Sequence, residues 1–214
     1  MVLAPVAPSR AKHAPPRPAL ESGDRMDREE FERRYNGRPD IKKAELIKGV
    51  VYVASPVRIP EHAAPHFELI GHLNDLRKAF PGVVGADNGT FRCSDGSEVQ
   101  PDIILRRTRR SGGTSWLDSE HYVNGSPEFV AEVSASSASY DLHAKKDLYR
   151  EVGVREYLVW QTEENVVQAW TLRDGQYVAI EPDSDGRIHS LVFPGMVIDP
   201  GVLFAGVSEV DEGD

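Results

Sequence analysis

The sequence predicts an α/β protein with a mixed central β-sheet flanked by helices and a C-terminal β-hairpin. Two observations favour this fold class. Apolar runs over Phe129–Val133 and Glu156–Trp160 enclose a helical pattern over Tyr140–Val152, which predicts a strand–helix–strand unit. Near the C-terminus, two apolar runs within residues 166–180 are joined by Asp174-Gly175, a sequence typical of a hairpin turn.

Length and composition favour a globular protein without a membrane segment. The chain has 214 residues, of which 40% are hydrophobic and 8% aromatic. No run approaches the ~20 apolar residues of a membrane helix, and the proline-rich start is unlike a signal peptide. The net charge of -9 disfavours indiscriminate nucleic-acid binding, so any nucleic-acid contact requires a local basic surface.

We expect one domain between two tails. Residues 1–25 are rich in proline and alanine and predict a disordered tail, residues 26–207 form the domain, and residues 208–214 form an acidic tail. Cys93 is the single cysteine, so no intrachain disulfide can form. This favours a reducing, cytoplasmic location.

Capping residues, turn residues and the periodicity of apolar residues predict the elements before the strand–helix–strand unit. Asp27 can cap a short helix, and Ala44–Val53 predicts a strand pair or one bent strand around Gly49. Pro65 begins a helix, because proline is tolerated at a first helical position. The remaining expectations are an apolar stripe of Phe67, Ile70, Leu73, Leu76 and Phe80, strands near Val83-Val84, Thr90–Cys93 and Val99–Leu105, a basic loop from Arg106 to Gly113, and a closing strand over Leu191–Phe193.

Three charged residues lie where apolar residues are expected. Glu132 interrupts the strand Phe129–Val133, and Asp102 opens an apolar strand directly after a proline. At about 100° per residue, Lys145 falls in the middle of the apolar stripe of its helix and Lys146 at the edge. A lysine that faces a core is costly unless an anion meets it, so we expect Lys145 to meet a carboxylate.

Two buried acids with a lysine above them suit metal-assisted hydrolysis of a phosphodiester. Carboxylate oxygens hold Mg²⁺, or Mn²⁺ in its place, while the metal keeps several waters. The metal polarises the phosphate and activates a water, and the lysine orients that water or stabilises developing charge. The alternative is a buried salt bridge between Glu132 and Lys145 that only specifies packing.

A series of short motifs gives the chain a family resemblance. They are Ala44-Glu45-Leu46-Ile47-Lys48-Gly49, Pro56 followed by Glu61-His62, Gln100-Pro101-Asp102, Glu132-Val133-Ser134, Asp141-x-x-x-Lys145-x-x-x-Tyr149 and Gly153-Val154-Arg155-Glu156-Tyr157. In this order, over about Met26 to Leu203, the chain resembles the Uma-two family of restriction-endonuclease-like proteins in the PD-(D/E)XK nuclease superfamily. The resemblance implies a restriction-endonuclease-like core and a metal-dependent DNA endonuclease.

The resemblance also implies residue roles. Asp102 and Glu132 become metal ligands, and Glu45 becomes a further acid beside the metal. The superfamily pattern would place its lysine at position 134, where this chain has Ser134, so the resemblance implies that Lys145 supplies it from the following helix. Three residues are assigned accessory roles: Gln100 on the strand face of Asp102, His62 lining the cleft, and Tyr149 packing against or holding Lys145.

Other residues leave two interpretations open. Arg106, Arg107, Arg109 and Arg110 either contact phosphates near the scissile bond or form a solvated loop. His62 and His66 are four residues apart, but Pro65 between them suggests that they do not share a helix face, and we expect no zinc site. DNA is the expected partner, as a monomer or a homodimer. The alternative function is a non-catalytic nucleic-acid-binding or regulatory protein that retains the fold.

Overall fold

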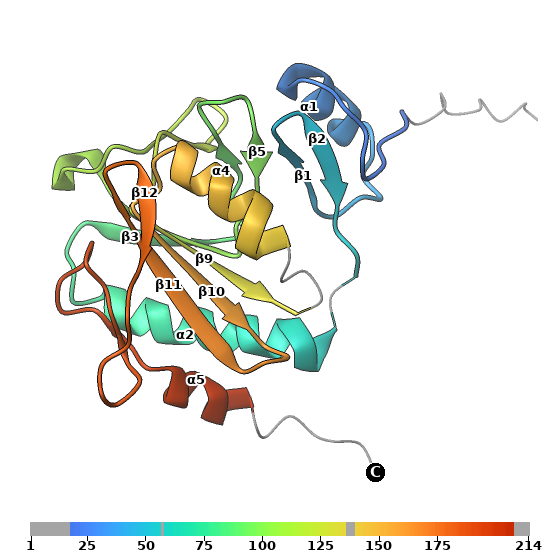
Figure 1. Ribbon diagram of the computed structural model, residues 1–214. Coiled ribbons are helices and arrows are strands. Elements are labelled where there is room, and N and C mark those ends of the chain that lie inside the picture. The colour runs from blue at the N-terminus through green and yellow to red at the C-terminus, as the bar shows by residue number, and fades with distance from the viewer. Residues whose placement is uncertain (1–17, 57, 136–139, 208–214) are drawn as a thin grey trace, which may run out of the picture.

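The computed structural model describes residues 18–56, 58–135 and 140–207. Their chain forms a mixed six-stranded central sheet, a second six-stranded sheet and a two-stranded sheet (Figure 1). The central sheet has the order β12-β11-β10-β9-β6-β3, and only β9 and β10 in it pair in parallel. Its strands are β3 (Val83–Asp87), β6 (Ile103–Arg107), β9 (Phe129–Ser134), β10 (Glu156–Gln161), β11 (Val166–Arg173) and β12 (Gln176–Ala179).

The predicted α/β class, strand–helix–strand unit and C-terminal hairpin are confirmed, and the second sheet is an addition to them. It has the order β2-β1-β5-β4-β8-β7, with a parallel pair between β4 and β8. Its strands are β1 (Ala44–Ile47), β2 (Val50–Val53), β4 (Phe91–Arg92), β5 (Glu98–Val99), β7 (Trp116–Leu117) and β8 (Val123–Asn124); β13 (Ile188–His189) and β14 (Val197–Ile198) form the small third sheet.

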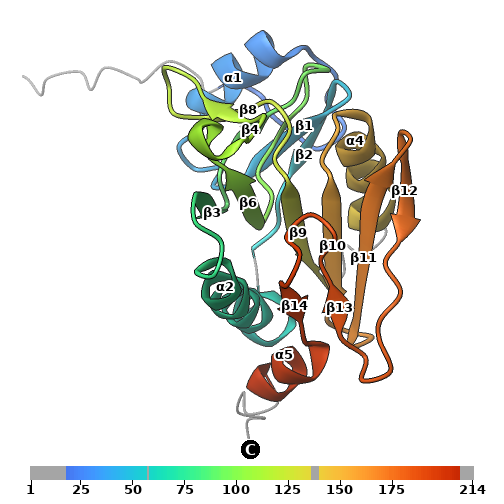
Figure 2. The same ribbon diagram turned by 90° about the vertical axis from the view of Figure 1, so that its left-hand side faces the viewer.

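Helices cover both faces of the central sheet. Figures 1 and 2 show α2 and α5 on one face and α4 on the other. None of the helices within the described ranges is long and apolar enough to cross a membrane. The helical segments are α1 (Arg28–Asn36), the π-helical turn η1 (Ile59–Ala63), α2 (Ala64–Arg77), the 3-10 turn η2 (Arg109–Ser111), the π-helical turn η3 (Asp141–Lys145), α4 (Lys146–Glu151) and α5 (Pro200–Val207).

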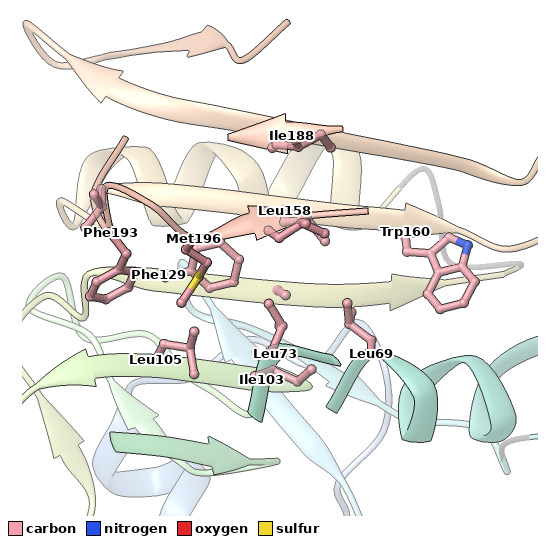
Figure 3. Packing of buried hydrophobic residues seen from close by; sticks show 14 of the residues in the cluster. Leu69, Leu73, Ile103, Leu105, Phe129, Leu158, Trp160, Ile188, Phe193 and Met196 are labelled. Atoms are coloured by element: carbon pink, nitrogen blue, oxygen red, sulfur yellow. The ribbon is translucent and has the colours of Figure 1, made fainter. Parts of the chain in front are cut away.

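The middle strands of the central sheet, β9 and β10, are buried on both faces. On the α2 face, Leu69 and Leu73 pack with Phe129 and other apolar side chains of the sheet (Figure 3). On the α4 face, Val130 packs with Leu148 and other residues of α4. Because successive side chains of a strand point to opposite faces, Glu132 shares the α4 face with Val130.

The predicted strand Val99–Leu105 is wrong, because the chain changes sheets within it. Val99 ends β5 in the second sheet and Ile103 begins β6 in the central sheet. Pro101 lies at this break, and a proline cannot donate a ladder hydrogen bond. Gln100 and Asp102 therefore do not share a strand face as predicted.

Two boundaries also differ from the predicted ones. Residues 18–25 pack on the domain: Leu20 is 2% exposed, and Gly23 N and Asp24 O both bond to Val51 of β2. The rest of the predicted tails, residues 1–17 and 208–214, lies outside the described residues. The predicted basic loop begins later than expected, because Arg106 and Arg107 belong to β6.

In α2 the predicted apolar stripe is only partly correct. Phe67 is 74% exposed, whereas Leu69 and Leu73 face the core. At about 100° per residue, Phe67 lies roughly 200° from Leu69 and so points away from the sheet. The helix also ends at Arg77 instead of continuing to Phe80.

The C-terminal segment contains a helix that was not predicted and lacks the predicted strand. The carboxylate of Glu156 accepts hydrogen bonds from the backbone N–H groups of Leu191 and Val192, so this segment is satisfied without strand pairing. The sequence feature that could have predicted α5 is the capping residue Asp199 directly before Pro200. The Asp199 carboxylate accepts from Gly201 N, and proline occupies the first helical position.

Candidate active site

Two carboxylates from neighbouring strands brace each other. The antiparallel register pairs Ile103 with Ala131, which places Asp102, just before β6, beside Glu132 of β9. The backbone N–H of Asp102 donates to Glu132 Oε2 at 3.2 Å, and Val133 N donates to Asp102 Oδ2 at 2.9 Å. Asp102 is 3% and Glu132 2% exposed. Both carboxylates are therefore buried at one point of the central sheet.

Lys145 meets these acids from the end of η3. Its Nζ lies 3.0 Å from Glu132 Oε1, 3.1 Å from Glu45 Oε2 and 3.7 Å from Asp141 Oδ1. Its neighbour Lys146 points elsewhere, with Nζ 3.6 Å from the centre of the Trp170 ring. The prediction that Lys145 is the inward-facing lysine is confirmed, although the helix begins with a π-helical turn.

Glu45, Gln100 and Tyr149 also lie at this point. Glu45, in β1 of the second sheet, accepts from Gln100 N at 2.7 Å through Oε1. The side-chain amide of Gln100 instead donates to the hydroxyl of Tyr35 at 3.4 Å. Tyr149 donates its hydroxyl hydrogen to Glu132 Oε1 at 2.8 Å. Gln100 thus contacts the cluster through its backbone, and Tyr149 through its side chain.

Both histidines reach Asp102, so the prediction that they do not share a face is wrong. His62 Nε2 is 3.3 Å from Asp102 Oδ2, and His66 Nε2 is 3.2 Å from Asp102 O and 3.3 Å from Asp87 Oδ1. Their ring centroids are 5.6 Å apart. The reason is that the helical chain already starts at Ile59 in η1, before Pro65, and continues into α2.

Lys43 is a member of the cluster that the sequence analysis missed. Its Nζ donates to Asp102 Oδ1 and to Asn88 Oδ1, both at 3.0 Å. Lys43 lies two residues before Glu45, and Lys43 O accepts from Ala54 N, which continues the pairing of β1 with β2. Residues two apart on a strand point to the same face, so this spacing could have identified Lys43.

The four arginines lie toward the other end of β6. Arg106 is four residues from Asp102, about 13 Å along an extended strand. The guanidinium of Arg107 lies over Phe193, 5.1 Å from the ring centre, and that of Arg109 over Trp116 at 4.9 Å. Their contact with phosphates stays a prediction, and this geometry favours phosphates at some distance from Asp102.

Burial and charge set opposite pKa shifts for the two acids. Burial raises the pKa of Glu132 to about 8, although the Lys145 ammonium acts to lower it. For Asp102, burial acts to raise the pKa, but the hydrogen bond from His62 and the charge of Lys43 outweigh it and hold the pKa well below its usual range. Burial also disfavours the Lys145 ammonium, yet Glu132, Glu45 and Asp141 raise its pKa well above the ordinary value.

The donor set fits a hard divalent cation. Four carboxyl groups (Glu45, Asp102, Glu132 and Asp141) lie around the ammonium groups of Lys43 and Lys145, so the cluster offers the oxygen ligands that such a cation prefers. The described residues contain no group of three or more His, Cys, Asp or Glu side chains arranged to hold a metal ion. Mg²⁺ needs only one or two carboxylates, because it keeps waters and binds substrate phosphates. Asp102 and Glu132 would hold such an ion, and some of the hydrogen bonds that their carboxylate oxygens now accept would be given up.

Comparison with known proteins gives the class of protein to which this fold belongs. A family model with the description "Uma2: Putative restriction endonuclease" matches residues 28–201, and the chain belongs to this family. It is also similar to a solved structure from Anabaena variabilis, described as a putative nuclease belonging to DUF820. That match has a TM-score of 0.64 and 12% identity, and covers 85% of this chain and 99% of the other. No curated protein matches the chain.

Proposed function

We propose that the protein is a Mg²⁺- or Mn²⁺-dependent endonuclease that hydrolyses DNA phosphodiester bonds. The observation that carries this proposal is the pair of buried, mutually braced carboxylates Asp102 and Glu132, with the further acid Glu45 sharing Lys145 with Glu132. The description of the family, "Putative restriction endonuclease", supports the same reaction.

Each residue has a role in this proposal. Asp102 and Glu132 would hold the metal ion, which supplies Lewis-acid polarisation of the phosphate and activation of a water. Lys145 and Tyr149 hold Glu132 Oε1 in place at 3.0 and 2.8 Å. Glu45 shares Lys145 with Glu132 and adds negative charge next to the metal ligands. The hydrogen bonds from neighbouring backbone N–H groups limit the motion of both ligand carboxylates.

Plasmid cleavage in the presence of Mg²⁺ or Mn²⁺ tests the proposal. Asp102→Asn and Glu132→Gln keep the size of the side chains and remove the ligand charge, so each should lower cleavage at least 100-fold. Asp183→Asn is the matched control, because the Asp183 carboxylate bonds with its own turn and with His189 of β13, away from the cluster. Cleavage at the wild-type rate by both Asp102→Asn and Glu132→Gln would refute the assignment.

A non-catalytic protein with the same fold is the second candidate. It is favoured by the hydrogen bonding of the acids, since every oxygen of Asp102 and Glu132 already accepts from a protein donor. The two candidates differ in their response to metal. A metal ion that binds the native state stabilises it by about 2.7 kcal/mol when the free metal concentration is 100 times the Kd. An increase in melting temperature with Mn²⁺ that is lost in Glu132→Gln supports the enzyme, whereas no increase in the wild-type protein supports the second candidate.

A further inference from the structure

The two lysines of the cluster differ in their access to solvent. The side chain of Lys145 is 4% exposed and that of Lys43 is 26% exposed. Lys145 comes from the helical side of the central sheet, whereas Lys43 comes from the start of β1 in the second sheet. A substrate phosphate approaching from solvent therefore meets Lys43 more readily than Lys145.

The charged surroundings of the two ammonium groups differ in the same direction. Lys145 faces three carboxylates, those of Glu132, Glu45 and Asp141. Among the described residues, Lys43 meets two acceptors, Asn88 Oδ1 and Asp102 Oδ1. Lys145 is therefore enclosed by carboxylates of the cluster, whereas Lys43 faces one carboxylate and one amide oxygen.

The contact of Lys43 with Asp102 competes with metal binding. Lys43 Nζ lies 3.0 Å from Asp102 Oδ1, so a cation that took this oxygen as a ligand would compete with the ammonium group. Asp102 Oδ2 is held by Val133 N and His62, from a strand and a helical turn. The long, flexible side chain of Lys43 is the most readily displaced of these donors.

We propose, on the basis of the proposed nuclease function, that Lys43 is the substrate-facing ammonium group of the site. Lys43 bonds to Asp102 Oδ1 in this structure; when Asp102 serves as a metal ligand, the released ammonium group of Lys43 would donate to a non-bridging oxygen of the scissile phosphate. Lys145 is in this arrangement a positioning residue, which holds Glu132 and Glu45.

Calorimetric titration of the full-length protein with Mn²⁺, without DNA, tests the first half of the proposal. Lys43→Met removes a positive charge that competes with Mn²⁺ for Asp102. Even with the screening of water, its removal should make the Mn²⁺ affinity about fivefold tighter. Lys48→Met is the control, because Lys48 pairs with Glu151 on the surface and should leave the affinity unchanged. Unchanged or weaker Mn²⁺ binding by Lys43→Met would overturn the competition.

Single-turnover cleavage at saturating Mn²⁺ tests the second half. Lys43→Met should slow cleavage at least 10-fold despite its tighter metal binding, and Lys43→Arg should recover part of the rate. If the wild-type protein cleaves and Lys43→Met cleaves at the same rate, Lys43 does not contact the phosphate and the inference fails while the proposed function stands. A wild-type protein that neither binds Mn²⁺ nor cleaves overturns the proposed function and the inference with it.

Discussion

Replacement of Lys145 by methionine should destabilise the protein by about 3–5 kcal/mol, the cost of leaving a buried charge without its partner. The side chain is 4% exposed and its Nζ lies within 3.7 Å of three carboxylates. Methionine has a similar length and leaves little empty volume, so the loss of charge dominates. For a domain of this size, the melting temperature should fall by roughly 6–20 °C.

Urea unfolding with EDTA present, followed by far-UV circular dichroism, measures this loss. The matched control is Lys146→Met, which removes a cation–π contact worth about 0.5–1 kcal/mol. The loss in Lys145→Met should also be larger at pH 9 than at pH 7. An acid with a raised folded-state pKa costs stability as the pH increases toward that pKa, so in the wild-type protein the cost of Glu132 stops growing near pH 8. Without Lys145 the pKa of Glu132 is higher still, and the cost continues to grow above pH 8. A loss in Lys145→Met within about 1 kcal/mol of the control would refute the reasoning.

Two further predictions concern single side chains. Burial, followed by the hydrogen bond with Glu32, raises the pKa of Glu98 from 4.5 to about 7, so stability is lost as the pH rises between these values. The change in the free energy of unfolding caused by Glu98→Gln should therefore be more stabilising at pH 8 than at pH 5, by up to about 3 kcal/mol in urea titrations. An equal change at both pH values would contradict this. Tyr149→Phe removes the hydroxyl donor of buried Glu132 and should cost about 1–3 kcal/mol in the same assay, whereas an unchanged midpoint would show that this hydrogen bond contributes nothing.

The core of the site could be predicted because local periodicity determines it. A period of two places Glu132 on one face of a buried strand, and the helical period places Lys145 inward and Lys146 at the edge. Both side chains are where these periods place them. A buried charge in an apolar pattern is a strong signal, because it requires a partner of opposite charge nearby.

The remaining members of the cluster depend on contacts between distant segments. Lys43 reaches Asp102 only because the second sheet meets the central sheet at this point, and the sequence analysis treated the two sheets as one. His66 reaches Asp102 because the π-helical turn η1 starts the helical chain before Pro65. Neither the crossing between sheets at Pro101 nor the π-helical turn has a periodic signature in the sequence.

The peripheral differences have a similar origin. Phe67 fits an apolar stripe as well as Leu69 does, and only packing against the sheet decides which of the two faces the core. The segment Leu191–Phe193 is apolar like a strand, but the carboxylate of Glu156 satisfies its backbone instead. Each of these outcomes depends on a partner more than 30 residues away in the chain.

Anomalous diffraction from crystals grown with Mn²⁺ tests the central claim most directly. We predict a Mn²⁺ peak within ligand distance of the carboxylates of Asp102 and Glu132, with Lys43 displaced from Asp102 Oδ1. At saturating Mn²⁺, no peak at these carboxylates, with Lys43 still bonded to Asp102 and Lys145 to Glu132, would contradict the claim that this cluster is a metal-dependent nuclease site.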